Sequence, residues 1–239
     1  LQGNIESAQY NPRDLGFLQA PNEISTSGSF GYYQFKPKGN LLQYNYRFNF
    51  TYARMYNPNA YNRAQIRTAG FWIFKNFWDL TTTAGFLFFE NDYSVLGDPL
   101  TYKRFVQRPS YGFISMNGST DSRKKLYFRQ EVFFANFFNS APNKDYHIVE
   151  GGLRYRFSNR FTLDFSHRHE GESDYIISAG RETNNEPIIA FVDFTDITSV
   201  LSGIYNFTPR INLTLRARHY LSRVKFNRFA NVHAKGNPI

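Results

Sequence analysis

The residues best suited to chemistry in this sequence are two histidines, His167 and His169, followed by Glu170. Successive side chains of a β-strand point to opposite faces, so histidines two positions apart share one face and could hold a metal ion. The alternative is that both imidazoles lie at the outer rim of a strand, where these rings tolerate an interface. We favour the rim, and we predict no metal site and no cofactor.

A hydrolase is the second chemistry to weigh, because some outer-membrane lipases place a serine and a histidine two positions apart on one strand face. No histidine here has a serine at that spacing; the five are His147, His167, His169, His219 and His233. A serine from a distant part of the chain could still reach one of them. Cysteine is absent, which removes disulfides and thiolate metal sites. We therefore expect no catalytic residue and no enzyme, with a hydrolase as the alternative.

The element that must position such side chains is a β-strand, and the segment from Leu42 to Tyr52 displays its pattern. Every even position there is Leu, Tyr or Phe, and every odd position is Gln, Asn, Arg or Thr. A period of two gives a strand one apolar face and one wet face, whereas a helix would scatter both kinds around its circumference. Long alternating segments with an aromatic outer face and a charged inner face are typical of a transmembrane β-barrel.

Composition agrees with a barrel and argues against other classes. Aromatic residues make up 19% of the chain, which suits girdles of rings at the membrane interfaces. The mean hydropathy is -0.51, and no run approaches the ~18 apolar residues of a spanning helix, but half of each barrel strand faces water. The net charge of +9 suggests nucleic acid, yet the basic residues are spread along the strands. We expect outer membrane lipid and other outer membrane or periplasmic proteins as partners, and no nucleic acid.

Turn residues and alternation divide the chain into about ten or eleven strands. The expected strands cover residues 1–8, 23–36, 41–56, 63–75, 79–91, 110–121, 125–138, 146–157, 161–170, 188–207 and 211–225. Tight three-residue turns are expected within 36–40, 75–79, 121–125, 157–161 and 207–211. Residues 10–17, 92–109 and 171–187 are predicted as loops. Outer-membrane barrels have short periplasmic turns and longer extracellular loops, so the five turns should lie at one end and the loops at 92–109 and 171–187 at the other.

The alternation assigns each side chain to the lumen or to the lipid. The charges expected in the lumen are Arg47, Arg67, Lys75, Arg129, Glu131, Glu150, Arg154, Arg156, Asp164, Arg168, Arg216 and Arg218. The side chains expected on the lipid face are Tyr44, Tyr46, Phe48, Phe50, Trp72, Phe74, Phe128, Phe134, Leu153, Tyr155, Leu163 and Phe165. The lumen charges are either a solvated, ion-paired interior that holds the shape of the barrel or a basic lumen that admits or binds anions.

The turn at 158–160 predicts two ion pairs across the inward face of its hairpin. Arg154 would lie opposite Asp164, and Glu150 opposite Arg168, with Cβ atoms ~5 Å apart. Pairs of opposite charge help to fix the register, because a slipped pairing would lose them.

The other predicted pair is Lys75 opposite Asp79, across the turn that follows Lys75. Arg156, Arg216 and Arg218 have no such partner in the predicted register. The lumen therefore stays net basic, which predicts a preference for anions.

Several short stretches resemble a family of uncharacterised Gram-negative outer membrane proteins. They are residues 11–18, 22–23, 56–58, 74–78 and 215–220. Members of this family carry an N-terminal module similar to family-nine carbohydrate-binding domains, followed by a C-terminal barrel. The resemblance covers nearly the whole chain, on the barrel side only. It implies an outer membrane location and a glycan connection, and it supplies no catalytic residues.

The sequence therefore predicts an all-β protein whose residues 1–239 form one antiparallel transmembrane β-barrel of the outer membrane, or most of one. Single-chain bacterial barrels have even strand numbers, so we expect a piece of a longer protein that lacks the N-terminal module and the closing strands. The expected function is non-enzymatic: a porin-like channel, uptake or structural barrel within a larger assembly. The alternatives are an outer membrane hydrolase with its site at the extracellular rim, and a soluble β-sandwich that binds carbohydrate.

Overall fold

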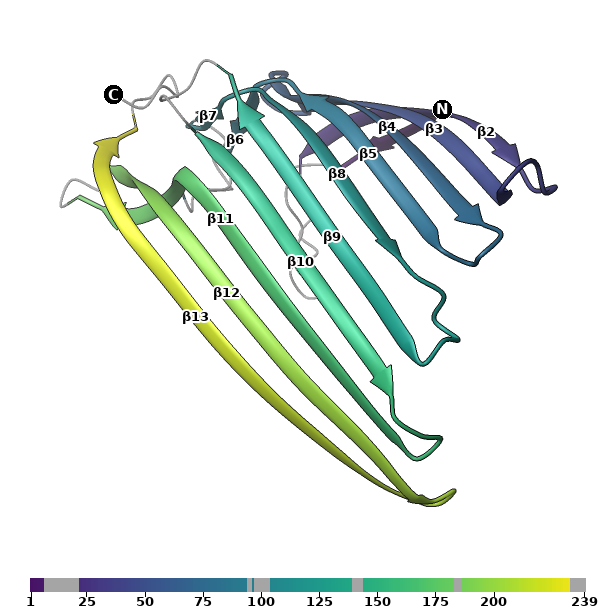
Figure 1. Ribbon diagram of the computed structural model, residues 1–239. Helices are drawn as coiled ribbons and strands as arrows, with labels where there is room; N and C mark the ends of the chain where they lie inside the picture. The colour runs from purple at the N-terminus through teal and green to yellow at the C-terminus, as the bar shows by residue number, and fades with distance from the viewer. Residues whose placement is uncertain (7–21, 94–95, 97–103, 139–143, 183–185, 233–239) are drawn as a thin grey trace.

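The computed structural model describes residues 1–6, 22–93, 96, 104–138, 144–182 and 186–232, and these form strands, turns and links between strands (Figure 1). Eleven strands make one antiparallel sheet in the order β1-β2-β3-β4-β5-β8-β9-β10-β11-β12-β13, while β6 pairs with β7 alone. The prediction of an all-β antiparallel protein is confirmed. The bounds are β1 Gln2–Ile5, β2 Glu23–Gln34, β3 Leu41–Met55, β4 Tyr61–Phe74, β5 Asp79–Leu87, β6 Glu90–Asp92, β7 Val106–Arg108, β8 Tyr111–Ser119, β9 Leu126–Phe137, β10 Asp145–Arg156, β11 Phe161–Arg181, β12 Pro187–Thr208 and β13 Ile211–Asn231.

Alternation explains both the strands and their register. Tyr44 lies opposite Trp72, and Phe48 lies opposite Phe30, so aromatic side chains are cross-strand neighbours on one face of the sheet. The Trp72 indole meets the Tyr46 ring edge-on at 5.7 Å and donates a hydrogen bond to its hydroxyl oxygen at 3.2 Å. Each such cross-strand pair stabilises the pairing by about 0.5 kcal/mol or more, and a one-residue slip would lose all of them together.

The predicted registers are right in two hairpins and shifted by two residues in the other three. Arg156 lies opposite Thr162 and Asn206 opposite Asn212, as three-residue turns require. After β4, however, Asp79 lies opposite Ile73 rather than Lys75. The hairpins β2–β3 and β8–β9 shift by the same amount. Because two is even, no side chain changes face, and the predicted division between the faces survives.

All five tight turns lie at one end of the sheet, along its right-hand edge in Figure 1. This confirms the predicted topology, because adjacent antiparallel strands joined in sequence must alternate between the two ends. The C-terminal ends of β3, β5, β9 and β11 lie at the opposite end. The predicted loop at 10–17 lies outside the described residues.

The predicted loop at 171–187 is wrong, because β11 continues to Arg181 and β12 begins at Pro187. The polar residues after Glu170 suggested a loop, but the apolar run at the start of β12 needs a partner. Ile176 lies opposite Phe191, and every residue from 189 to 192 is buried. The register shifts between Glu172 and Tyr175, where Asp174 has a φ of 56°. The polar stretch of β11 therefore forms a β-bulge-like irregularity, after which the strand pairs with β12 again.

The predicted strand 79–91 ends at Leu87, and the predicted loop at 92–109 contains strand β7, which pairs with β6. Residues of this loop contribute to both buried apolar clusters of the described chain. On one side Tyr93 and Phe105 pack against Met55 at the end of β3. On the other side the segment packs against the ends of β11, β12 and β13. That second cluster comprises Leu96, Val106, Ile176, Ile189, Phe191, Ala230 and Val232.

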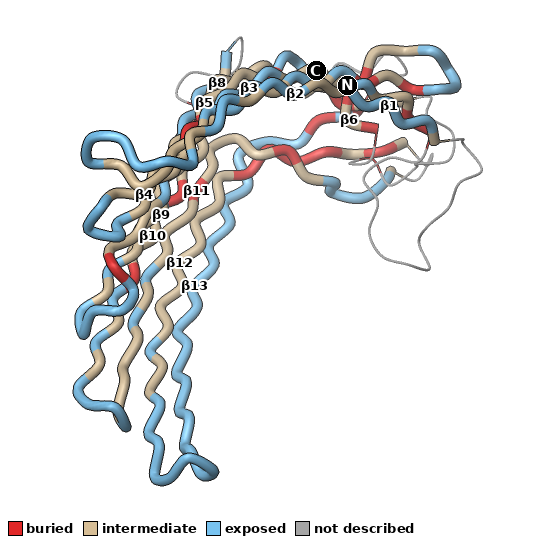
Figure 2. The backbone as a smooth tube through the Cα atoms, turned by 90° about the vertical axis from the view of Figure 1, so that its right-hand side faces the viewer, coloured by how far each residue is buried: buried red, intermediate tan, exposed pale blue. Residues whose placement is uncertain are grey.

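The sheet curves into an arch, with β6 beneath it, but it does not close (Figure 2). Within the described residues, β1 and β13 are its two edges. The convex face carries all the side chains predicted to face lipid. Each of them is exposed or half-buried, and none belongs to the buried core. No helix of the described chain is long and apolar enough to cross a membrane.

Candidate functional site

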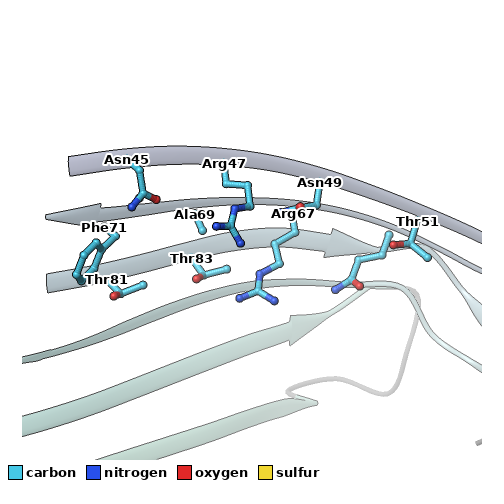
Figure 3. Close-up of a pocket in the computed structure, with 11 residues that line it drawn as sticks. Asn45, Arg47, Asn49, Thr51, Arg67, Ala69, Phe71, Thr81 and Thr83 are labelled. Atoms are coloured by element: carbon cyan, nitrogen blue, oxygen red, sulfur yellow. The ribbon is translucent and has the colours of Figure 1, made fainter. Parts of the chain in front are cut away.

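Strands β3, β4 and β5 hold a polar pocket of about 500 Å³ on the concave face (Figure 3). Alternation positions the lining, because odd-numbered residues of all three strands point to this face. The lining residues are Asn45, Arg47, Asn49, Thr51, Gln65, Arg67, Ala69, Gly70, Phe71, Thr81 and Thr83. Arg47 and Arg67 were predicted to face the lumen. The uncharged polar members were not singled out, although the same alternation could have found them.

Arg47 and Arg67 project into this pocket from neighbouring strands (Figure 3). Arg47 lies opposite Ala69, while Arg67 lies opposite Asn49 and Gly85. Ala69 is small, the Phe113 ring from β8 lies over Gly85, and both arginines are exposed. Their guanidinium groups are therefore accessible to solvent.

No carboxylate lines the pocket, and no hydrogen bond or ion pair holds Arg47 or Arg67 within the described part of the chain. A guanidinium offers a planar fork of N–H donors that matches carboxylate and phosphate oxygens. The amides of Asn45, Asn49 and Gln65 add further donors at the wall. The arrangement can therefore bind an anion.

The predicted pair of Glu150 and Arg168 is confirmed. Arg168 Nη1 lies 3.3 Å from Glu150 Oε2, and its Nη2 lies 2.8 Å from Glu170 Oε2 on the same strand. One guanidinium is thus shared between two carboxylates, so this part of the concave face keeps a net negative charge. Glu131 lies directly opposite Glu150 on β9.

Arg154 lies directly opposite Asp164, so the predicted register is confirmed, but the two side chains do not form an ion pair with each other. Asp164 instead accepts two hydrogen bonds, at 2.9 and 3.0 Å, from Arg129 on β9. Arg129 reaches across β10 above Gly152, which has no side chain to stop it. Arg154 places its guanidinium 4.5 Å from the centre of the Tyr127 ring and donates to the Ser122 carbonyl at 2.6 Å. The bidentate geometry with Arg129 is the stronger arrangement for the carboxylate.

The predicted pair of Lys75 and Asp79 is wrong, because the hairpin register places Asp79 opposite Ile73. Asp79 Oδ2 accepts a hydrogen bond from the Ser119 hydroxyl on β8. Lys75 lies in the turn after β4, where its backbone N–H donates to the Asn40 carbonyl at 2.9 Å. The turn closes through Phe77 with a positive φ of 62°, which the count of turn residues could not anticipate.

The remaining predicted lumen cations also share the concave face. Arg156 donates to the carbonyls of Ser122 and Arg123 in the neighbouring turn, at 3.1 and 3.3 Å. Arg216 and Arg218 lie opposite Ser202 and Val200 on the edge strand β13 and are exposed. They have no carboxylate partner among the described residues, as the sequence predicted.

The three histidines of β10 and β11 lie on the convex face and make two separate contacts. His147 Nε2 is 3.3 Å from His169 Nδ1, with the rings stacked, and His147 Nδ1 is 3.2 Å from Asp145 Oδ2. His167 Nδ1 is 2.9 Å from the Ser199 hydroxyl on β12. No group of three or more His, Cys, Asp or Glu in the described ranges could hold a metal ion.

Among the residues that the structure describes, the His167–Ser199 contact favours a hydrolase. A serine nucleophile also needs a group that orients its histidine and donors that stabilise an oxyanion. In the described residues no hydrogen bond holds the other His167 ring nitrogen. The neighbouring backbone N–H groups are engaged in the sheet. One hydrogen bond therefore does not assemble a catalytic site.

The chain belongs to the family described as a domain of unknown function, DUF5916, which it matches over residues 1–239. No curated protein matches it significantly, and no solved structure does. The polar pocket of the concave face therefore has to be interpreted from its own residues.

Proposed function

We propose that this chain forms most of the wall of a transmembrane β-barrel in a Gram-negative outer membrane, with a non-enzymatic role in the passage of solutes. The concave face would line the lumen, and the convex face would contact lipid. The free arginines of the concave face favour anions among the solutes. Other outer membrane or periplasmic proteins would complete a larger assembly.

The observation that carries this proposal is the inverted polarity of the sheet. Large apolar side chains on the convex face are exposed, including Phe48, Phe134 and Leu215, the last at 71%. Over β3, β4 and β5 the concave face holds arginines, amides and hydroxyls around an open pocket. Its apolar side chains gather elsewhere, in the stacked rings of Phe113 and Phe133 and in the clusters against the β6–β7 segment. Water does not favour so large an apolar outer surface, whereas lipid does. For this reason we do not favour a soluble carbohydrate-binding sandwich.

Closure of the wall requires strands beyond those described here. The strand β13 spans 21 residues with one edge unpaired, and β1 forms the other edge. Unpaired N–H and C=O groups at membrane depth cost several kcal/mol each, so a membrane-embedded sheet must pair both edges. We propose that further strands close the barrel. This agrees with the resemblance to outer membrane proteins, whose N-terminal carbohydrate-binding-like module connects them to glycans.

Two single-tryptophan reporters test the assignment of the faces. Phe48→Trp and Asn49→Trp place the reporter on adjacent residues of opposite faces, in a background where Trp72 and Trp78, the two natural tryptophans, are replaced by Phe. In liposomes of brominated lipid, the tryptophan at 48 should be quenched strongly and that at 49 weakly, with aqueous iodide giving the reverse order. Equal quenching at both positions, or none by lipid, would overturn the membrane proposal.

Anion passage is tested separately by measuring, in planar bilayers, the conductance of the full-length protein that includes the strands closing the barrel. Anion-selective current is the expected result, and cation-selective current would contradict the preference. If the quenching assay confirms the two faces but no current flows, the protein is a structural barrel rather than a channel.

A further inference from the structure

Arg47 and Arg67 differ from most other arginines of the concave face, because those have partners within the protein. Arg129 binds Asp164, Arg168 binds Glu150, and Arg63 binds Glu23, at 2.9, 3.3 and 3.1 Å. Arg154 and Arg156 donate to backbone carbonyls. The two arginines of the pocket have no such partner in the described chain, and both are exposed on adjacent strands, so their guanidinium groups are available to a ligand.

Their positions in the sheet allow both guanidinium groups to reach one ligand. Arg67 lies two residues from Ala69, the residue opposite Arg47, so the two arginines form a diagonal cross-strand pair with Cα atoms roughly 7–8 Å apart. An arginine side chain is longer than half this separation, and both guanidinium groups lie at the same pocket (Figure 3). Two positive charges at such a short separation repel each other, and an anion between them removes this repulsion.

We propose that this pocket is a specific binding site for an organic anion, held by Arg47 and Arg67 through a phosphate or carboxylate group. The site deepens the proposed function, since it would lie on the path of a solute through the lumen. Asn45, Asn49 and Gln65 supply amides, and three threonines line the remaining wall, so the body of the ligand should be polar and rich in hydrogen-bonding groups. Phe71 is the one aromatic side chain of the lining and offers an apolar surface.

Charge-matched variants separate a specific site from the general field of a basic lumen. Arg47→Gln/Arg67→Gln removes two charges from the pocket. Arg216→Gln/Arg218→Gln removes two from the same face on the edge strand, outside the pocket. The probes are inorganic phosphate and citrate, with glucose as the uncharged comparison. Binding to the whole chain in detergent is measured by calorimetric titration at two salt concentrations.

The proposal predicts that phosphate or citrate binds the wild type and that glucose does not bind measurably. Loss of the pocket pair should weaken binding by about tenfold or more, while loss of the β13 pair should change it by less than about twofold. A preference for phosphate over citrate, or the reverse, identifies the anionic group. Equal weakening by both double variants, or wild-type binding to neither anion, would overturn the site.

Failure of this site and failure of the proposed function give different results. If the lumen is basic without a specific site, anion-selective conductance persists in both double variants and falls by a similar amount. If the chain is not a membrane barrel, brominated lipid does not quench the tryptophan at position 48. This result does not depend on whether the calorimetric titration detects anion binding. Circular dichroism of each variant establishes that it retains its β-sheet.

Discussion

At the residue scale, the absence of one side chain redirects an ion pair. Gly152 lies between Arg129 and Ser166 in the sheet, and the Arg129 side chain passes over it to Asp164. A Cβ atom on Gly152 would lie 2.6 Å from Arg129 Nε and Cζ. The neighbouring Gly151 has nothing within 4 Å of such an atom. A methyl group at position 152 would therefore collide with Arg129, whereas one at position 151 would meet no other atom.

We predict that Gly152→Ala displaces Arg129 and lowers stability, whereas Gly151→Ala does not. The pair is about one-third exposed, so its loss should cost no more than about 1 kcal/mol. The measurement is the thermal midpoint in detergent. In the Gly152→Ala background, Arg129→Gln should have a smaller effect than in the wild type. Equal losses for the two glycine variants would contradict this account.

At the scale of elements, two neighbouring hairpin turns are joined by one arginine. Asp121 accepts hydrogen bonds from the Arg123 backbone N–H and from two nitrogens of its guanidinium, at 2.9–3.0 Å. The same guanidinium stacks 3.6 Å from the centre of the Phe77 ring in the turn between β4 and β5. The Asp121 carboxylate thus holds Arg123 in the position that connects the two turns.

This contact predicts a pH dependence of stability. The hydrogen bonds from Arg123 lower the pKa of Asp121 from 3.8 to about 2. A carboxyl group with a lowered pKa in the folded state stabilises it above the unfolded pKa, and the contribution disappears as pH falls through the folded value. The wild type should therefore exceed Asp121→Asn in thermal midpoint at pH 7, and the difference should vanish between about pH 4 and pH 2. A difference that stays constant down to pH 2 would rule out this role for the carboxylate.

At the scale of the whole molecule, the β6–β7 segment connects parts of the sheet that are distant in strand order. Asn91 Nδ2 donates to the Tyr61 carbonyl at the start of β4, at 3.0 Å. Arg181 at the end of β11 donates to the Leu96 carbonyl at 3.3 Å. Four strands separate β4 from β11 in the sheet. The segment therefore braces the arch from within, at the end opposite the tight turns.

Val106 tests this brace, because its side chain is fully buried in the cluster that joins β7 to β11–β13. Val106→Ala should destabilise the chain by roughly 1–2 kcal/mol through lost burial and a small cavity. Ile114→Ala on the convex face is the control, since Ile114 is 58% exposed and should have little effect on the thermal midpoint in detergent. A larger loss for Ile114→Ala would place the stabilising core elsewhere.

The sequence by itself determined the strands, their faces and the side of the sheet on which the turns lie. These follow from local patterns: a period of two, and turn residues between the strands. The segment from Leu42 to Tyr52 and the hairpin around Ser158 needed no other information. A register error of two residues, as at Lys75, left the faces unchanged because the period is two.

Only the tertiary structure decided what depends on residues distant in the chain. Residues 171–181 are a strand because the buried run at the start of β12 lies beside them, which their own polar composition does not indicate. Asp164 pairs with Arg129 because Gly152 opens a path across β10. The pocket around Arg47 and Arg67 takes its lining from three strands, so it exists only once β3, β4 and β5 lie side by side in the sheet.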